Sequence, residues 1–155
     1  MVGHVSSYVP NMVNASKCWR WNVTSRELGE RLVYFNMTPR KSMTLVFPTI
    51  EELDIRSFTR GLIDGDGSIA KKFNNSKTPT LAVSFCSASQ SFIEPFHKFL
   101  KDVSGSNSSI NKNRNMYNIR YVGLGARNIA HFLYDASSEH NRMTRKFVVA
   151  NEFLR

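Results

Sequence analysis

Residues 58 to 68 read Phe58-Thr59-Arg60-Gly61-Leu62-Ile63-Asp64-Gly65-Asp66-Gly67-Ser68. Gly61 and Gly65 stand four residues apart and therefore share one face of a helix, where each costs about 1 kcal/mol relative to alanine. Small residues at this spacing allow two helices to pack closely together. The stretch predicts a helix that packs on a second helix through a stripe of Phe58, Gly61, Leu62 and Gly65.

Asp66 falls at the C-terminal end of this predicted helix, where the negative end of the helix dipole disfavours a carboxylate. When two such helices pack side by side, their carboxylates repel each other unless a cation lies between them. Such a site suits Mg²⁺ or Mn²⁺, held by few carboxylates, by water and by phosphate oxygens. The sequence therefore predicts a divalent metal at Asp66, with Gly65 beside it. A calcium loop is excluded, because Ile69 and Asn75 stand where it needs glycine and glutamate.

Helices and strands alternate around this stretch. The helix is predicted to begin at Thr49, because Thr49 and Glu52 have the spacing of a capping box, and to end near Gly65. Phe85 and Phe96 are predicted core residues, because they fall on the apolar side of their periods. The elements that follow are strands over 68–73 and 80–87, a helix over 89–103, a hairpin over 109–122, and helices from about 126 and 141. The order is αββαββα.

The N-terminal residues predict a further strand and helix. Residues 17–23 alternate in the manner of a half-buried strand, which assigns Trp19 and Trp21 to a core. A capping box of Thr24 and Glu27 predicts a helix that follows. Residues 43–47 are predicted as a short strand or extended segment.

A weak repeat relates the two ends of the chain at a spacing of one hundred residues. Trp19-Arg20-Trp21 precedes Ile119-Arg120-Tyr121, and Leu32-Val33-Tyr34 precedes Phe132-Leu133-Tyr134. Each copy leads to a basic pair, Arg40-Lys41 or Arg145-Lys146. We therefore predict an extension over 1–48, a β-hairpin and helix resembling the end of a preceding half, and a main domain over 49–155. Coincidence between two amphipathic units is the alternative.

The composition favours a polyanion as the partner. The chain has 155 residues, with 21 Lys and Arg against 12 Asp and Glu, and a formal charge of +9. A basic protein without a polyanion partner is the alternative. No apolar run is long enough to span a membrane and the N-terminus lacks a secretory signal, so we expect an intracellular protein without membrane contact.

Residues 60–67, together with the αββαββα order, resemble the LAGLIDADG homing endonucleases, although Thr59-Arg60 replace the usual Leu-Ala. The resemblance covers residues 49–155 and implies an α+β fold. In it the signature helices of two halves pack together, and an antiparallel sheet lies in the DNA major groove. The resemblance also implies that Asp66 binds the catalytic metal and that Asp64 is more structural. The implied reaction hydrolyses one phosphodiester in each strand of double-stranded DNA.

Further site residues follow from the resemblance. The residue that orients the attacking water corresponds to Ser89 or Gln90. Gly123 takes the place of an auxiliary lysine, so Lys146 or Lys41 would have to reach in. The outer face of both hairpins and the basic turns carry short polar or basic side chains that suit base edges and phosphates, with an ordinary solvated face as the alternative. These predicted DNA-binding residues are Ala70, Lys72, Asn74, Thr80, Ala82, Ser84, Cys86, Lys112, Arg114, Asn118, Arg120, Arg40, Lys41 and Arg145.

The sequence thus predicts a site-specific, metal-dependent DNA endonuclease of the homing type. The alternatives are an RNA-binding intron maturase and a DNA-binding regulator that has lost cleavage, and the vacant lysine position would fit a weakened or inactive nuclease. One signature helix cannot complete a two-carboxylate centre. We therefore expect a C2 homodimer, with a separate chain that supplies the second helix as the alternative.

Overall fold

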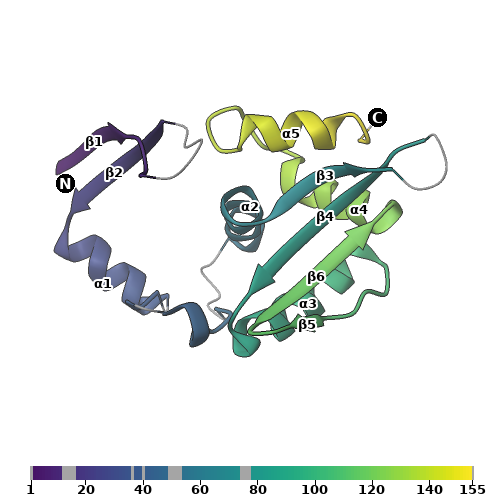
Figure 1. The fold of residues 1–155 in the computed structure, drawn as a ribbon, viewed down its shortest axis with the longest axis horizontal. Coiled ribbons are helices and arrows are strands. Elements are labelled where there is room, and N and C mark those ends of the chain that lie inside the picture. The colour runs from purple at the N-terminus through teal and green to yellow at the C-terminus, as the bar shows by residue number, and fades with distance from the viewer. Residues whose placement is uncertain are drawn as a thin grey trace. The chain divides into compact units, whose positions relative to one another are not determined.

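The computed structural model describes residues 2–11, 17–35, 37–39, 41–48, 54–73 and 78–154. The chain divides into two compact units, residues 1–38 and residues 39–155 (Figure 1). No helix within the described ranges is long and apolar enough to cross a bilayer.

The first unit is a hairpin followed by a helix. Strand β1 (Val2–Tyr8) pairs antiparallel with β2 (Cys18–Thr24), and helix α1 (Arg26–Tyr34) follows. The N-cap of α1 is Ser25, whose side chain accepts a hydrogen bond from the backbone N–H of Leu28, so the predicted cap at Thr24 is wrong by one residue.

The two tryptophans of the first unit do not lie in a core. Trp19 and Trp21 are 69% and 65% exposed. Their assignment to a core is therefore wrong, although the predicted strand itself is confirmed. Alternation identifies the residues that share a face, but burial requires a second layer, and no described residue of this unit is buried.

The second unit is built on one antiparallel sheet and confirms the αββαββα order. The sheet has the strand order β3-β4-β6-β5. Its elements are α2 (Ile55–Gly65), β3 (Ser68–Lys72), β4 (Thr80–Ser87), α3 (Gln90–Ser104), β5 (Asn111–Asn113), β6 (Met116–Val122), α4 (Leu124–Tyr134) and α5 (Thr144–Asn151).

Helices α3 and α4 cover one face of this sheet (Figure 1). The core between them contains Phe85 of β4 and Phe96 of α3, as predicted. Gly105 ends α3 with φ 62°, a left-handed conformation that glycine adopts without strain. The opposite face of the sheet carries no helix of this unit in the described chain (Figure 1), and Ser68, Ala70, Cys86, Asn118 and Arg120 on it are exposed.

Two predictions concern the segment before the signature helix. Of the two forms predicted for residues 43–47, the strand is wrong: a 3-10 turn (Lys41–Met43) comes first, and Phe47 then packs against the ring of Phe58 and the phenylalanines of α3. Helix α2 begins at Ile55, six residues after the predicted start. Its N-cap is Asp54, whose carboxylate accepts hydrogen bonds from the Ser57 hydroxyl and from the backbone N–H groups of Ser57 and Arg56, and these bonds lower the pKa of that carboxyl. The predicted capping pair, Thr49 and Glu52, lies outside the described residues.

Candidate metal centre and nucleic-acid interface

Helix α2 has a buried face and an open face. Thr59, Arg60, Ile63 and Asp64 are buried, whereas Gly61 and Gly65 are exposed. A Cβ added at either glycine would meet nothing within 4 Å. Phe58 and Leu62, the other two members of the predicted stripe, are partly buried against the core. The glycine half of the stripe therefore has room for a second helix.

Asp64 ties α2 to the elements behind it. Its carboxylate accepts a hydrogen bond of 2.7 Å from the hydroxyl of Tyr134 and one of 2.9 Å from the backbone N–H of Met143. Burial, and then the bond to Asp64, raise the pKa of the Tyr134 hydroxyl, which stays a donor. These contacts support the structural role expected for Asp64.

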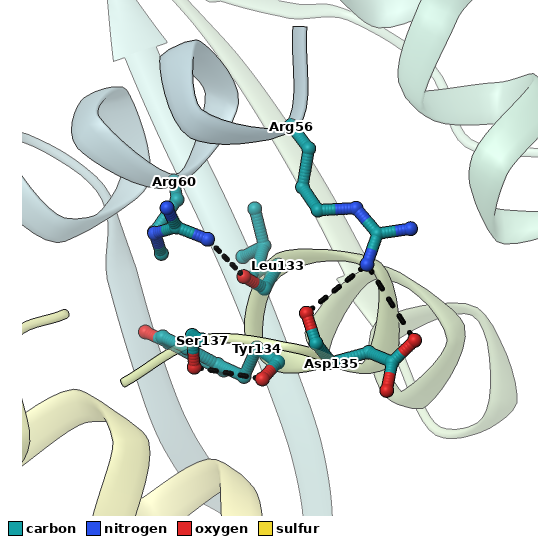
Figure 2. A network of polar contacts seen from close by, with 6 residues as sticks. All are labelled: Arg56, Arg60, Leu133, Tyr134, Asp135 and Ser137. Carbon is teal, nitrogen blue, oxygen red and sulfur yellow. Dashed lines mark hydrogen bonds and ion pairs between the residues drawn. The ribbon is translucent and has the colours of Figure 1, made fainter. Parts of the chain in front are cut away.

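Arginines of α2 hold the end of α4 (Figure 2). Nη1 of Arg60 donates to the carbonyl of Leu133 at 3.1 Å, and its Nε donates to the carbonyl of Asn141 at 2.9 Å. Arg56 reaches the carbonyl and the carboxylate of Asp135 at 3.0 and 3.5 Å. Arg60 is a departure from the usual signature, and its buried guanidinium joins α2 to the α4–α5 loop.

Lys146 caps the C-terminal end of α2. Its Nζ donates to the carbonyls of Ile63, Asp64 and Gly67 at 2.6, 2.8 and 2.6 Å. An ammonium has three donors, so all of them are used, and the residue is only 4% exposed. Burial, and then the neighbouring Arg145, lower the pKa of this ammonium. The ammonium of Lys146 therefore has no free N–H for the predicted role in catalysis. The structure supports a positioning role for Lys146 instead.

The oxygens left at this helix end suit a hard cation. Asp66 is the C-cap of α2, and its exposed carboxylate forms no hydrogen bond or ion pair with the residues that the structure describes. Lys146 donates to the carbonyls of Ile63 and Asp64 before Gly65 and to that of Gly67 after it. The carbonyl of Gly65 itself receives no hydrogen bond from the described residues. A carboxylate and a carbonyl are donors that Mg²⁺ accepts, with water and substrate oxygens in its other positions. The described ranges hold no cluster of three or more His, Cys, Asp or Glu that could bind a metal.

The open face of the sheet brings most of the predicted DNA-binding residues together. In the register, Ser84 lies between Ser68 and Arg120, and Cys86 lies opposite Asn118. The other predicted members on this face are Ala70 and Lys72 of β3 and Thr80 and Ala82 of β4, of which Ala82 is buried. This face starts at Ser68, two residues after Asp66, so the candidate metal centre adjoins it.

Other predicted DNA-binding residues lie elsewhere. Lys112 pairs with Tyr117, and its Nζ lies 4.9 Å from the centre of that ring, so it occupies the helix-covered side of the sheet, apart from the other predicted members. Arg114 lies in the turn after β5, and Arg145 is exposed on α5. Lys41 begins the 3-10 turn. Asn74 and Arg40 lie outside the described residues.

The two candidates for orienting a water differ. Ser89 is fully buried and its hydroxyl donates to the carbonyl of Leu45, which does not fit contact with an attacking water. Gln90 is exposed at the start of α3, where its amide donates to Glu94 at 2.7 Å and accepts from the Tyr117 hydroxyl at 2.8 Å. Of the two, only Gln90 remains a candidate.

Comparison with known proteins identifies a match over α2 to α4. A family model described as a LAGLIDADG-like domain matches residues 54–135, more than half of the chain. The chain is similar to the homing endonuclease I-CvuI, which was solved in complex with the I-CreI target in the presence of Mg, with the DNA not cleaved. The two chains share 17% sequence identity and a TM-score of 0.45, and the match covers 64% of this chain and 62% of that one. It is also similar to the homing endonuclease I-TnaI, at 16% identity and a TM-score of 0.41, covering 63% and 67%. The chain thus spans less than two thirds of I-CvuI. No curated protein matches.

Proposed function

The chain belongs to the LAGLIDADG family, and from this premise we propose that it is a site-specific endonuclease that hydrolyses double-stranded DNA with Mg²⁺ or Mn²⁺. The observation that carries the proposal is the end of α2. There Asp66 presents an exposed carboxylate beside the open carbonyl of Gly65, while Lys146 occupies the neighbouring carbonyls.

In this proposal different residues bind the metal, position helix α2 and contact the DNA. Asp66 and Gly65 would hold the ion, which when bound supplies an activated water and stabilises charge on the phosphate. Lys146, Asp64 and Arg60 keep the end of α2 in place through the contacts described above. Arg120 and Lys72 on the open face contact base edges and phosphates in the major groove. In this proposal the scissile phosphate lies next to Asp66.

A cleavage assay tests the proposal. The purified protein is incubated with a randomised plasmid library and Mg²⁺, and we expect linear products that share one cut sequence and vanish with EDTA. Gly123, where the family expects an auxiliary lysine, and the occupied ammonium of Lys146 favour a second candidate, a DNA-binding protein without cleavage. Sequence-specific retention of library DNA without any cutting would establish that candidate, and selective retention of structured intron RNA would establish the maturase.

Binding to DNA should weaken steeply with salt, because phosphate contacts release counterions. Arg120→Ala is expected to cost about 1–3 kcal/mol of binding free energy and to relax the preference at one base position, because Arg120 lies in the middle of the open face. Lys101→Ala, on helix α3 of the covered side, is the matched control and should change little. Fluorescence anisotropy between roughly 50 and 200 mM salt measures both, and a flat salt dependence would reject the nucleic-acid groove.

Assembly should depend on the open glycines of α2. We propose that a second signature helix packs on Gly61 and Gly65, and a second copy of the chain is the source that the sequence favours. Gly61→Leu is expected to abolish pairing and cleavage while the monomer stays folded, because its side chain points into open space. Lys101→Ala, on helix α3 of the covered side, serves as the control here as well.

Sedimentation of both variants and of the unmodified protein, with DNA and Mg²⁺ present, gives the answer. A dimer that survives Gly61→Leu would rule out pairing through this stripe. A strict monomer of the unmodified protein under the same conditions would reject the homodimer.

A further inference from the structure

The first unit has an uncovered apolar face. On its strand pair Val5 lies opposite Trp21, Trp19 shares their face, and all three side chains are more than half exposed. The end of α1 adds three more exposed apolar side chains, Leu32, Val33 and Tyr34. A two-stranded hairpin alone is marginally stable in water, and apolar patches of this kind mark interaction surfaces. The unit therefore needs a cover.

The second unit contains the same arrangement with its face covered. Strands β5 and β6 and helix α4 repeat the order of β1, β2 and α1. At the repeat spacing of one hundred residues, Trp19 corresponds to Ile119 and Trp21 to Tyr121. Ile119 and Tyr121 are 1% and 2% exposed. The corresponding positions thus differ in burial and not in the local order of elements.

In the second unit, the face that carries Ile119 and Tyr121 is covered by β4 and by the helices around it. Strand β6 pairs with β4, which places Ile119 opposite Phe85 and Tyr121 opposite Val83. Helix α4 contacts α2, α3 and β4. At the end of α4 the hydroxyl of Tyr134 donates to a carboxylate of the signature helix α2. The cover is therefore a helix–strand–strand–helix segment, residues 54–105.

We propose that β2 and α1 form the docking surface for another helix–strand–strand–helix unit, related to residues 54–105 and carrying a signature helix of its own. Its second strand pairs with the edge of β2 that β1 leaves open, and its signature helix meets Tyr34 as α2 meets Tyr134. A second copy of this chain does not fit, because both edges of its β4 are already paired, with β3 and β6.

The inference rests on the uncovered face and the internal repeat, not on nuclease activity. Its failure would therefore leave the proposed cleavage standing, and loss of cleavage would leave the docking surface standing.

Tryptophan fluorescence of the full chain tests the free state of this surface. Trp19 and Trp21 are the only tryptophans of the chain, so the emission reports on the first unit alone. We expect the spectrum of solvent-exposed indoles, easily quenched by acrylamide and independent of protein concentration. Buried indoles at all concentrations would mean that the chain covers the face itself. Burial that grows with concentration would mean that a second copy covers it. Either result overturns the proposal.

A fusion protein tests the occupant. A copy of residues 54–105 is joined by a flexible linker ahead of residue 2 of the full chain, which gives it a high effective concentration. We expect a blue shift of the tryptophan emission and slower hydrogen exchange at the amides of β2 that face away from β1. Val83→Asp in the added copy should abolish both effects, whereas Cys86→Asp, on its open face, should leave them intact.

A second fusion tests whether the size of the two tryptophan side chains prevents the added copy from docking on β2. It carries Trp19→Ile and Trp21→Tyr, so that β2 presents the residues that β4 already pairs with in the second unit. Hydrogen exchange of β2 is the readout, and protection in either fusion supports the proposal. Unprotected β2 amides in both fusions would overturn it.

Discussion

Asp66→Asn is expected to abolish cleavage, by about a thousandfold or more, while DNA binding stays intact or tightens. In the proposed site this carboxylate would be the charged oxygen ligand at the open end of α2. The metal that it would hold would supply several kcal/mol of transition-state stabilisation, and each 1.4 kcal/mol is about tenfold in rate. Binding should not suffer, because the substitution removes a negative charge beside the phosphates. Single-turnover cleavage and anisotropy on the same target measure the two effects.

Asp64→Asn is the contrast to this substitution. Both carboxylate oxygens of Asp64 accept hydrogen bonds, from Tyr134 and from the backbone of Met143, and an amide would turn a donor toward one of those donors. We therefore expect a loss of stability with residual cleavage in the molecules that stay folded. Full metal-dependent nicking by Asp66→Asn would contradict the assignment of Asp66. Unchanged stability of Asp64→Asn would contradict the structural role of Asp64.

Lys146→Met is expected to lower the free energy of unfolding by about 3 kcal/mol, because each buried acceptor left without its donor costs roughly 1–3 kcal/mol. Methionine keeps the apolar stem of the side chain but removes the ammonium that the carbonyls of Ile63, Asp64 and Gly67 share. Urea denaturation measures the change as a shift of the midpoint at constant slope. The carbonyl end of α2 would then also be free to move, so cleavage should fall with it.

Arg145→Met is the matched control for this prediction. Arg145 precedes Lys146 on α5 and carries the same charge, but it is exposed, so its loss should change stability by no more than about 0.5 kcal/mol. Equal midpoints for the two variants would contradict the capping role of Lys146. Loss of stability at Lys146 with full cleavage in the folded fraction would confine that residue to folding.

Local patterns predicted most elements of the second unit. The predicted strand over 80–87 coincides with β4, because the alternation of Leu81, Val83 and Phe85 is a property of the strand itself. The helix predicted over 89–103 is α3, which ends at Gly105. The start of α2 was mispredicted, because the hydrogen bonds that Asp54 accepts from the first turn set the beginning of the described helix.

The first unit shows that periodicity predicts which residues share a face but does not predict whether that face is buried. The alternation at Trp19 and Trp21 correctly predicted a strand with both residues on one face. Whether that face is buried depends on a layer that no local pattern contains. Ile119 and Tyr121, which correspond to Trp19 and Trp21 in the repeat, are buried because β4 lies beside them.

The sequence by itself determined the signature helix, the place of Asp66 at its end and the polar face of the sheet, because these depend on spacings within one helix or one strand. The tertiary structure alone decided the partners of Asp64 and Lys146. Tyr134 donates to Asp64 across 70 residues, and Lys146 donates to the carbonyl of Ile63 across 83. Such contacts exist only once α4 and α5 have folded back onto α2, and a spacing rule that spans one or two helical turns carries no information about groups so far apart in the chain.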